Sequence, residues 1–301
     1  MTGNVDPITE IACCFGEGSQ LTGVYTPAPG SHRDKPCMVY LTAGLLHHIG
    51  PTRLHVEMAR ALANDHVSGF RFDLSGVGDS ETSALGGYFQ ERSVSEIRQA
   101  LNYLQASYGC GSFVLVGLCS GADDALVTAA KDQRVTGLVL LNGYAYRAGY
   151  FWLFRFLKFY LPRLLMPEKL LGKLKRLVTR LANRDSDTAL VDQRALDKLD
   201  SNYRYIPPRE ETEDLLVRLE REQTDMLLVY TGSEHEEYTY GGQLFAMFPQ
   251  LRHSPYVKEL YASRADHTFI LEADREKLIG QVRTWYAKAP FKRVPLHLNK
   301  T

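Results

Sequence analysis

Short apolar runs alternate along most of this chain with longer stretches in which apolar side chains recur every three or four residues. The short runs are typical of buried strands, and the longer stretches are typical of helices with one apolar face. Strands are predicted over residues 11–15, 20–25, 37–42, 67–72, 112–116, 135–141, 226–230 and 256–262, and helices over 53–63, 94–108, 125–131 and 274–288. This alternation predicts an α/β fold, with a mostly parallel sheet that helices cover on both faces.

The alternation stops between residues 146 and 221, where no strand pattern occurs. The stretch begins with aromatic side chains, Tyr150 and Trp152 among them, and continues with many Lys and Arg side chains. We expect a helical cap over 146–221, inserted into a core formed by 1–145 and 222–301, because ligands bind at the carboxyl edge of such sheets. Three interpretations stay open: a cap that binds substrate through Tyr150 and Trp152, a plain packing layer, or a basic surface that docks on an anionic membrane or an acyl-carrier protein.

The run GLCSGA, with Cys119 at its centre, follows one predicted strand and precedes a predicted helix. A strand, a tight turn flanked by glycine and a helix are typical of a nucleophile elbow. The elbow needs small residues two positions before and two after its apex, and Gly117 and Gly121 occupy these positions around Cys119. Ser120 at the apex would have leucine and alanine there, which fits less well. The pattern therefore predicts a thiol nucleophile.

A thiol nucleophile needs a base, and the base needs a third group that orients it. His267 lies directly after the last predicted strand, where a loop can bring an imidazole to the carboxyl edge of the sheet. A structural loop histidine is the alternative. The orienting acid should follow the penultimate strand, where Glu234 and Glu236 stand on either side of His235. Glu234 is slightly favoured, although a solvated acidic loop would look the same in sequence.

The loop after the strand at 37–42 predicts an oxyanion hole. It contains Gly44, so the backbone N–H of Leu45 can point at a reacting carbonyl. The second donor would be the N–H of Ser120, which follows the nucleophile at a helix N-terminus. The same helix terminus favours a thiolate. Gly44, Leu46 and His47 are candidate substrate contacts, with solvent-facing loop residues as the alternative.

Composition narrows the class of protein. The chain has 35 Lys and Arg and 35 Asp and Glu residues, and this zero net charge argues against a nucleic-acid partner. Its five cysteines show neither a disulfide framework nor the paired spacing of a zinc site. We therefore expect a reducing, cytoplasmic location, no metal and no cofactor. Residues 1–10 lack a signal pattern, and no apolar run is long enough to span a bilayer.

The glycine-rich turn DLSGVGDS, residues 73–80, fits neither a dinucleotide fingerprint nor a phosphate-binding loop with its lysine. It resembles the D-x-x-G-x-G-x-S segment of the α/β-hydrolase superfamily, and residues 266–267 resemble the late D-H element of that superfamily. The resemblance covers nearly the whole chain. The GLCSGA run, taken with residues 43–45, 50–54 and 71–74, is most similar to the Cys-nucleophile hydrolases of the exosortase-associated type. Dienelactone hydrolases and polyester synthases also have a thiol at this position.

The resemblance implies an α/β-hydrolase fold and acyl transfer through a thioester on Cys119, with His267 as base. The superfamily usually has aspartate where this chain has His235, which leaves Glu234 or Glu236 as the orienting acid. The expected reaction is hydrolysis of an ester or thioester of a small-molecule or carrier-bound acyl group. One alternative is an acyltransferase or cyclase that passes the acyl group to an alcohol or amine. Another is a hydrolase scaffold that only binds a ligand. The sequence does not indicate an oligomeric state.

Overall fold

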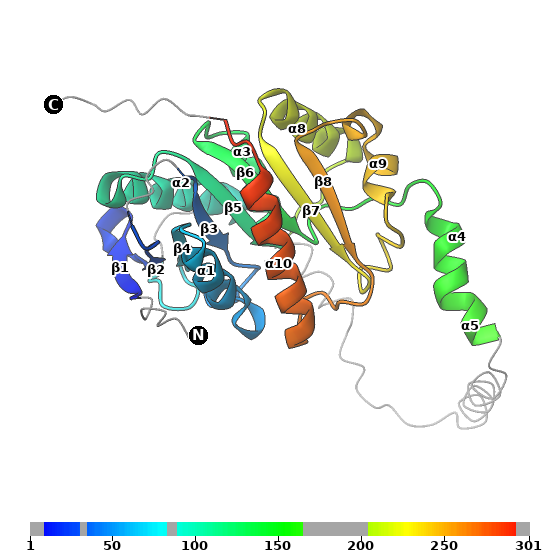
Figure 1. Ribbon diagram of the computed structural model, residues 1–301, viewed down its shortest axis with the longest axis horizontal. Coiled ribbons are helices and arrows are strands. Elements are labelled where there is room, and N and C mark those ends of the chain that lie inside the picture. The colour runs from blue at the N-terminus through cyan, green and yellow to red at the C-terminus, as the bar shows by residue number, and fades with distance from the viewer. Residues whose placement is uncertain (1–8, 31–34, 83–88, 165–203, 293–301) are drawn as a thin grey trace, which may run out of the picture.

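One eight-stranded sheet organises the chain (Figure 1). The computed structural model describes residues 9–30, 35–82, 89–164 and 204–292. The strands are β1 (Ile11–Phe15), β2 (Leu21–Thr26), β3 (Cys37–Leu41), β4 (Gly69–Phe72), β5 (Phe113–Leu118), β6 (Val135–Leu141), β7 (Asp225–Thr231) and β8 (Val257–Ala262). Their order is β1-β2-β4-β3-β5-β6-β7-β8, with β1 and β2 antiparallel to their neighbours and the other strands parallel.

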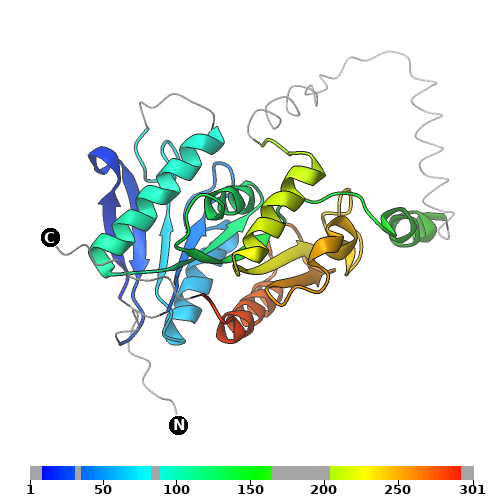
Figure 2. The ribbon, with the colours of Figure 1, turned by 90° about the horizontal axis from the view of Figure 1, so that it is seen from above.

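Helices cover both faces of the sheet, as the view from above shows (Figure 2). One face carries α1 (Leu54–Asn64) and α10 (Glu272–Lys288), and the other carries α2 (Phe89–Tyr108), α3 (Ser120–Ala129) and α8 (Arg209–Arg221). The shorter helical segments are η1 (Glu17–Ser19), η2 (Pro51–Arg53), α4 (Phe151–Arg155), η3 (Phe156–Tyr160), α5 (Leu161–Leu164), α9 (Gln243–Met247) and η4 (Pro249–Leu251). The predicted fold class is therefore confirmed.

The central strands β3, β5 and β6 are almost entirely apolar because each of them is buried on both sides. In β3, Cys37, Val39 and Leu41 pack into the core beneath α2, α3 and α8, whereas Met38 and Tyr40 pack into the core beneath α1 and α10. All five side chains are buried. Continuous apolar runs of this kind could be recognised in the sequence, and each of the predicted strands lies within a few residues of its observed bounds.

The helices agree less closely with their predicted bounds. Helix α2 begins at Phe89, five residues before the predicted start at position 94, because its first turn carries mainly polar side chains and breaks the apolar spacing. Helix α9 was not predicted, and α8 was expected only as part of the helical cap over 146–221. Helix α8 lies within the predicted cap range, 146–221, yet its Leu216 and Leu219 belong to the main core.

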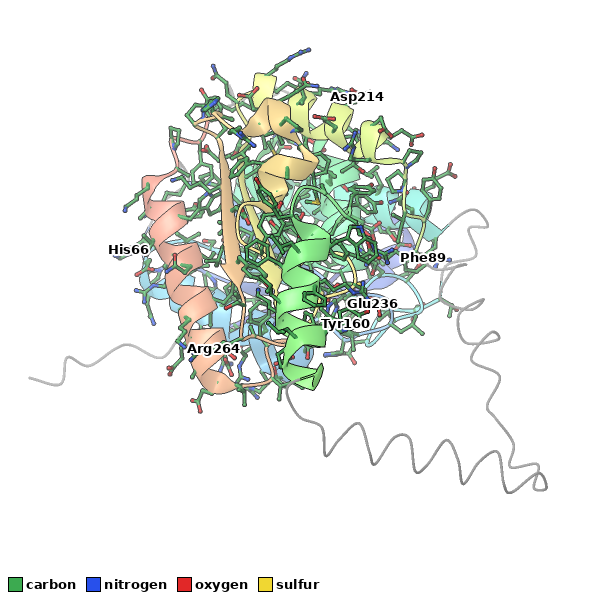
Figure 3. The ribbon with its side chains drawn as sticks, turned by 90° about the vertical axis from the view of Figure 1, so that its right-hand side faces the viewer. His66, Phe89, Tyr160, Asp214, Glu236 and Arg264 are labelled. Atoms are coloured by element: carbon green, nitrogen blue, oxygen red, sulfur yellow. The ribbon has the colours of Figure 1, made fainter. Side chains whose placement is uncertain are left out.

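The first part of the predicted cap is helical and runs alongside the β7–β8 end of the sheet (Figure 3). Phe151 is buried, and the ring of Phe154 stacks on Tyr240 with 4.9 Å between centroids. The basic stretch that we expected to meet a membrane or a carrier protein lies mostly in 165–203, outside the described residues. No helix in the described ranges is long and apolar enough to cross a membrane.

Candidate active site

Cys119 stands at a strained turn between β5 and α3. Its backbone has φ 53° and ψ −120°, a conformation that a residue with a side chain adopts only when its surroundings enforce it. A Cβ on Gly117 would lie 2.1 Å from the carbonyl oxygen of Gly121, and a Cβ on Gly121 would lie 2.6 Å from that of Thr42. Helix α3 thus approaches the sheet so closely that both flanking positions require glycine, as the nucleophile-elbow interpretation predicts.

His267 follows β8 and meets the side chains of Cys119 and Glu234. Its Nδ1 contacts Oε1 of Glu234, and its pKa is raised to about 10, first by a hydrogen bond with Cys119 and then by the bond with Glu234. Burial acts in the opposite direction and is outweighed. Because Nδ1 is engaged by the carboxylate, Nε2 is the ring nitrogen left for the sulfur. The order sulfur, imidazole, carboxylate is the one that general-base activation of a thiol requires.

The two candidate acids have separate surroundings. Glu234 begins a turn in which its carbonyl oxygen accepts the N–H of Glu237 and of Tyr238, and its side chain lies against His267. The side chain of Glu236, labelled in Figure 3, is 68% exposed and lies 4.0 Å from a guanidinium nitrogen of Arg155 on α4. The structure therefore brings only Glu234 of the two into the group around Cys119.

Asn142, which directly follows β6, ties this group together. Its Nδ2 donates to the backbone oxygen of His267 at 3.1 Å, and its Oδ1 accepts the N–H of Thr231 at 2.9 Å. These bonds join the loop after β8 to the end of β7. Asn142 therefore holds the histidine loop at the same edge of the sheet as Glu234.

The loop after β3 lies beside the start of α3. The N–H of Gly44 donates to Oγ of Ser120 at 2.8 Å, which joins the two elements from which oxyanion donors were expected. Within the described residues, the N–H groups of Leu45 and Ser120 have no protein acceptor. Leu45 and Leu46 are 68% and 42% exposed, and the hydrogen bond from this loop to Ser120 comes from the backbone of Gly44.

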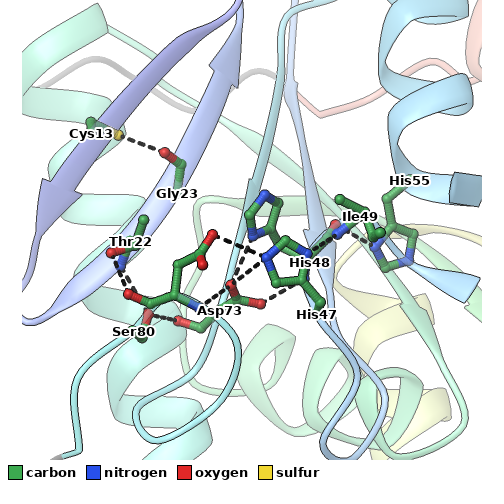
Figure 4. Close-up of polar contacts among 10 residues, drawn as sticks. Cys13, Thr22, Gly23, His47, His48, Ile49, His55, Asp73 and Ser80 are labelled. Atoms are coloured by element: carbon green, nitrogen blue, oxygen red, sulfur yellow. Dashed lines mark hydrogen bonds and ion pairs between the residues drawn. The ribbon is translucent and has the colours of Figure 1, made fainter.

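A buried carboxylate anchors the same loop (Figure 4). Asp73 accepts the N–H and the Nδ1 of His48 at 2.6 and 2.8 Å, and the N–H of Asp79 at 3.0 Å. His47 Nε2 lies 3.0 Å from the carboxylate of Asp79. A Cβ on Gly78 would lie 2.3 Å from Asp73, so the glycine-rich turn must close tightly on this carboxylate. The turn therefore supports the loop after β3, and His47 is part of that support.

Within the described part of the chain, the two histidines and two aspartates of this network form a group that could hold a metal ion. The ligand atoms of His47, His48, Asp73 and Asp79 all lie within 4.8 Å of one another. The oxygens of Asp73 already accept three hydrogen bonds, so the group is satisfied as a hydrogen-bond network.

An arginine that the sequence analysis missed reaches the sulfur from a second direction. Nη1 of Arg204 lies 3.3 Å from Sγ of Cys119, while its Nε and Nη2 lie 2.6 and 3.2 Å from the carboxylate of Asp123. Burial raises the pKa of Asp123 to about 6, against the lowering effect of the guanidinium. Asp123 lies one turn after Cys119 on α3, and the two adjacent acids of this otherwise apolar helix, Asp123 and Asp124, were the signal that the sequence offered.

Two predicted substrate contacts do not join this group. Tyr150 and Trp152 are 68% and 63% exposed. Tyr150 packs edge-on against Tyr240, and Trp152 lies beneath the guanidinium groups of Arg147 and Arg155. Their described contacts are therefore with Tyr240, between β7 and β8, and with arginines close to them in the sequence.

Comparison with known proteins identifies the family. Residues 45–280 match the family model described as alpha/beta hydrolase fold. No curated protein matches the sequence. A putative hydrolase from Agrobacterium vitis is similar over 93% of this chain and 99% of its own, with a TM-score of 0.54 and 19% identity.

Two further solved structures have the same fold. An esterase from Pyrococcus furiosus covers 94% of this chain and 93% of its own, with a TM-score of 0.58 and 12% identity. An alpha-beta serine hydrolase homologue from Coxiella burnetii covers 92% and 98%, with a TM-score of 0.53 and 14% identity. The family match supports an enzyme of the hydrolase type, and the chain belongs to the α/β-hydrolase family.

Proposed function

We propose that the protein hydrolyses an ester or thioester through a covalent thioester on Cys119. The observation that carries this proposal is the strained turn that presents Cys119 to His267, which in turn contacts Glu234. A buried structural cysteine would need neither the strained backbone nor an imidazole held by a carboxylate. We assign Cys119 as nucleophile, His267 as base and Glu234 as the orienting acid.

In the first half-reaction, Nε2 of His267 takes the thiol proton and Sγ of Cys119 attacks the carbonyl carbon. The negative charge moves to the carbonyl oxygen, which the N–H groups of Leu45 and Ser120 bind. Donors fixed in place before the reaction stabilise this charge without reorganisation. The C–O or C–S bond to the leaving group then breaks, and the leaving group takes the proton from His267.

In the second half-reaction, His267 takes a proton from water as the water oxygen attacks the thioester carbon. The C–S bond breaks, its electron pair returns to sulfur, and the carboxylic acid leaves. The acyl group comes from a small molecule or from a carrier-bound thioester. An alcohol or amine in place of water would make the protein an acyltransferase. The thiol at position 119 favours this second candidate, because amines attack thioesters faster than water does.

Mass spectrometry of the protein mixed with p-nitrophenyl esters of increasing chain length tests the proposal. We expect an acyl adduct on the peptide that contains Cys119, and release of p-nitrophenol that Cys119→Ala abolishes. Cys14→Ala is the matched control, since that cysteine is exposed and lies on β1, at the far edge of the sheet. Turnover that survives Cys119→Ala would refute the assignment, and a protein that binds the esters with neither an adduct nor release of p-nitrophenol would be a ligand-binding module.

A further inference from the structure

Arg204 makes an unusual set of contacts for a residue so close to a nucleophile. Its guanidinium lies between the carboxylate of Asp123 and the sulfur of Cys119, with its carbon 5.9 Å from the centroid of the Tyr144 ring. Nη2 also reaches the carbonyl oxygen of Asn142 at 3.5 Å. The side chain is about a quarter exposed, so it is largely shielded from water while it touches the sulfur.

The contacts of the guanidinium account for its orientation. Its Nε and one N–H of Nη2 are directed to Asp123. These two contacts fix the plane of the guanidinium, so that Nη1 points at Cys119. Asp123 is buried, which raises the pKa of its carboxyl to about 6, and the guanidinium that faces it opposes this rise. The two side chains therefore form one unit on α3 and on the segment that precedes α8.

The chemistry of this unit suits a thiolate and not a hydroxyl group. A guanidinium keeps its charge at every physiological pH. Beside a neutral hydroxyl it would donate an ordinary hydrogen bond to the oxygen. Beside sulfur it lowers the free energy of the anion, which a thiol can form near neutral pH and a serine hydroxyl cannot. Two cations, the His267 imidazolium and the Arg204 guanidinium, thus reach the sulfur from separate elements.

We propose that Arg204 is a further catalytic residue, which stabilises the thiolate of Cys119 before attack and again when the thioester breaks. This inference rests on the proposed function. When the acyl group bonds to Sγ the sulfur becomes neutral and the attraction to Arg204 is lost. When the C–S bond breaks the electron pair returns to sulfur beside the guanidinium, which makes the thiolate a better leaving group. Asp123 acts through Arg204 and is a positioning residue.

The pH dependence of alkylation tests this inference without any ester substrate. Wild type and Arg204→Gln are treated with iodoacetamide from pH 5 to 10, and the rate at Cys119 is followed by peptide mass spectrometry. The exposed Cys14 in the same sample is the internal reference. We expect Arg204→Gln to move the midpoint of the Cys119 profile upward by about one pH unit. Its plateau at high pH should equal or exceed that of wild type, because a more basic thiolate is more nucleophilic.

Matched variants separate charge from shape. Arg204→Lys keeps the charge and should move the midpoint less than Arg204→Gln does. Arg209→Gln removes an exposed arginine that pairs only with Glu210 in the described contacts, and it should leave the midpoint in place. If Arg204→Gln fails to fold because Asp123 is left unpaired, the double variant Asp123→Asn/Arg204→Gln replaces the ion pair with two neutral amides and carries the same test.

An unchanged midpoint in Arg204→Gln or in the double variant would overturn the inference, and so would an equal fall in rate at every pH, which would indicate a steric effect. The acylation experiment on the wild type is read separately. An acyl adduct on Cys119 with no dependence on Arg204 would leave the proposed function standing and refute this inference. A shifted midpoint with neither an acyl adduct nor release of p-nitrophenol would support the stabilised thiolate and refute the proposed function.

Discussion

Glu234→Gln removes one negative charge from the side chain that meets Nδ1 of His267 and leaves its size almost unchanged. The change affects two properties of the imidazole. The cation that forms during attack loses a charged partner, and the ring loses the acceptor that fixes the proton on Nδ1. An amide can turn its NH₂ group toward Nδ1 instead, which would move the ring proton to Nε2, where it blocks the acceptance of a proton from the thiol.

The size of the effect follows from the exposure of the pair. A hydrogen bond to a charged group contributes roughly 1.5–3 kcal/mol. The side chains of His267 and Glu234 are 36% and 26% exposed, so water screens the pair and the lower end of that range applies. That alone corresponds to a loss of about tenfold, since 1.4 kcal/mol is a factor of about ten. The wrong tautomer of a catalytic histidine adds more, up to about 10⁴ in serine proteases. We expect kcat/KM to fall about 10²- to 10³-fold.

The assay is the release of p-nitrophenol from a short-chain ester, measured from pH 5 to 10 for Glu234→Gln and for Glu236→Gln. Glu236 is a matched control because it lies two residues away, carries the same charge and faces Arg155 at 4.0 Å instead of His267. Its variant should keep kcat/KM within about twofold of wild type, as expected for a weak surface ion pair. In Glu234→Gln the pKa of His267 should also fall, because one of the groups that raise it is gone.

Two outcomes would contradict this reasoning. If Glu234→Gln keeps kcat/KM within about threefold of wild type, the contact with His267 does not orient the base. If Glu236→Gln loses more activity than Glu234→Gln, the two glutamates have the opposite roles in solution. Urea unfolding of both variants serves as the check that neither loss of activity reflects loss of the fold.

Two further predictions concern stability. Gly121→Ala should lower the free energy of unfolding in urea by about 2–4 kcal/mol, because its Cβ would lie 2.6 Å from the oxygen of Thr42. Gly280→Ala on α10 is its control and should raise that free energy by about 0.5–1 kcal/mol, because nothing lies within 4 Å of its Cβ. The pKa of His267 is raised from 6.5 to about 10, so the folded protein binds this proton more tightly than the unfolded chain does. The resulting stabilisation is complete below pH 6.5 and is lost as the pH rises toward 10. The urea midpoint of His267→Asn should therefore fall less over this range than that of wild type, and equal slopes would contradict the assignment of this pKa.

The fold could be predicted because its main signals are local in the sequence. A strand buried on both faces is apolar at almost every position, and β3, β5 and β6 are fully buried runs of this kind. The elbow could be predicted for a steric reason, since the close approach of α3 to the sheet leaves no room for a side chain at Gly117 or Gly121. The position of His267 followed from chain order, because the carboxyl ends of parallel strands meet at one edge of the sheet.

The choice between Glu234 and Glu236 could not be made from the sequence because it depends on the direction of a turn. Both residues follow β7 and both are exposed enough to be solvated. The turn that starts at Thr231, whose oxygen accepts the N–H of Glu234 at 3.3 Å, directs Glu234 to the histidine and Glu236 to Arg155. Arg204 was missed for a different reason: it meets Cys119 across 85 positions of the chain, and no spacing pattern encodes such a contact.

The presence of two cations around one sulfur has a consequence for rate. Each tenfold gain in the thiolate population lowers the intrinsic nucleophilicity of the sulfur by about threefold, because nucleophilicity falls with basicity. The net gain in attack is therefore only about threefold for each such step, and it ends once the thiol is fully ionised. Expulsion of the thiolate from the second tetrahedral intermediate has no such limit, since a less basic sulfur leaves faster. The Arg204–Asp123 pair should thus favour the breaking of the thioester more than its formation, which suits an enzyme that must release its acyl group.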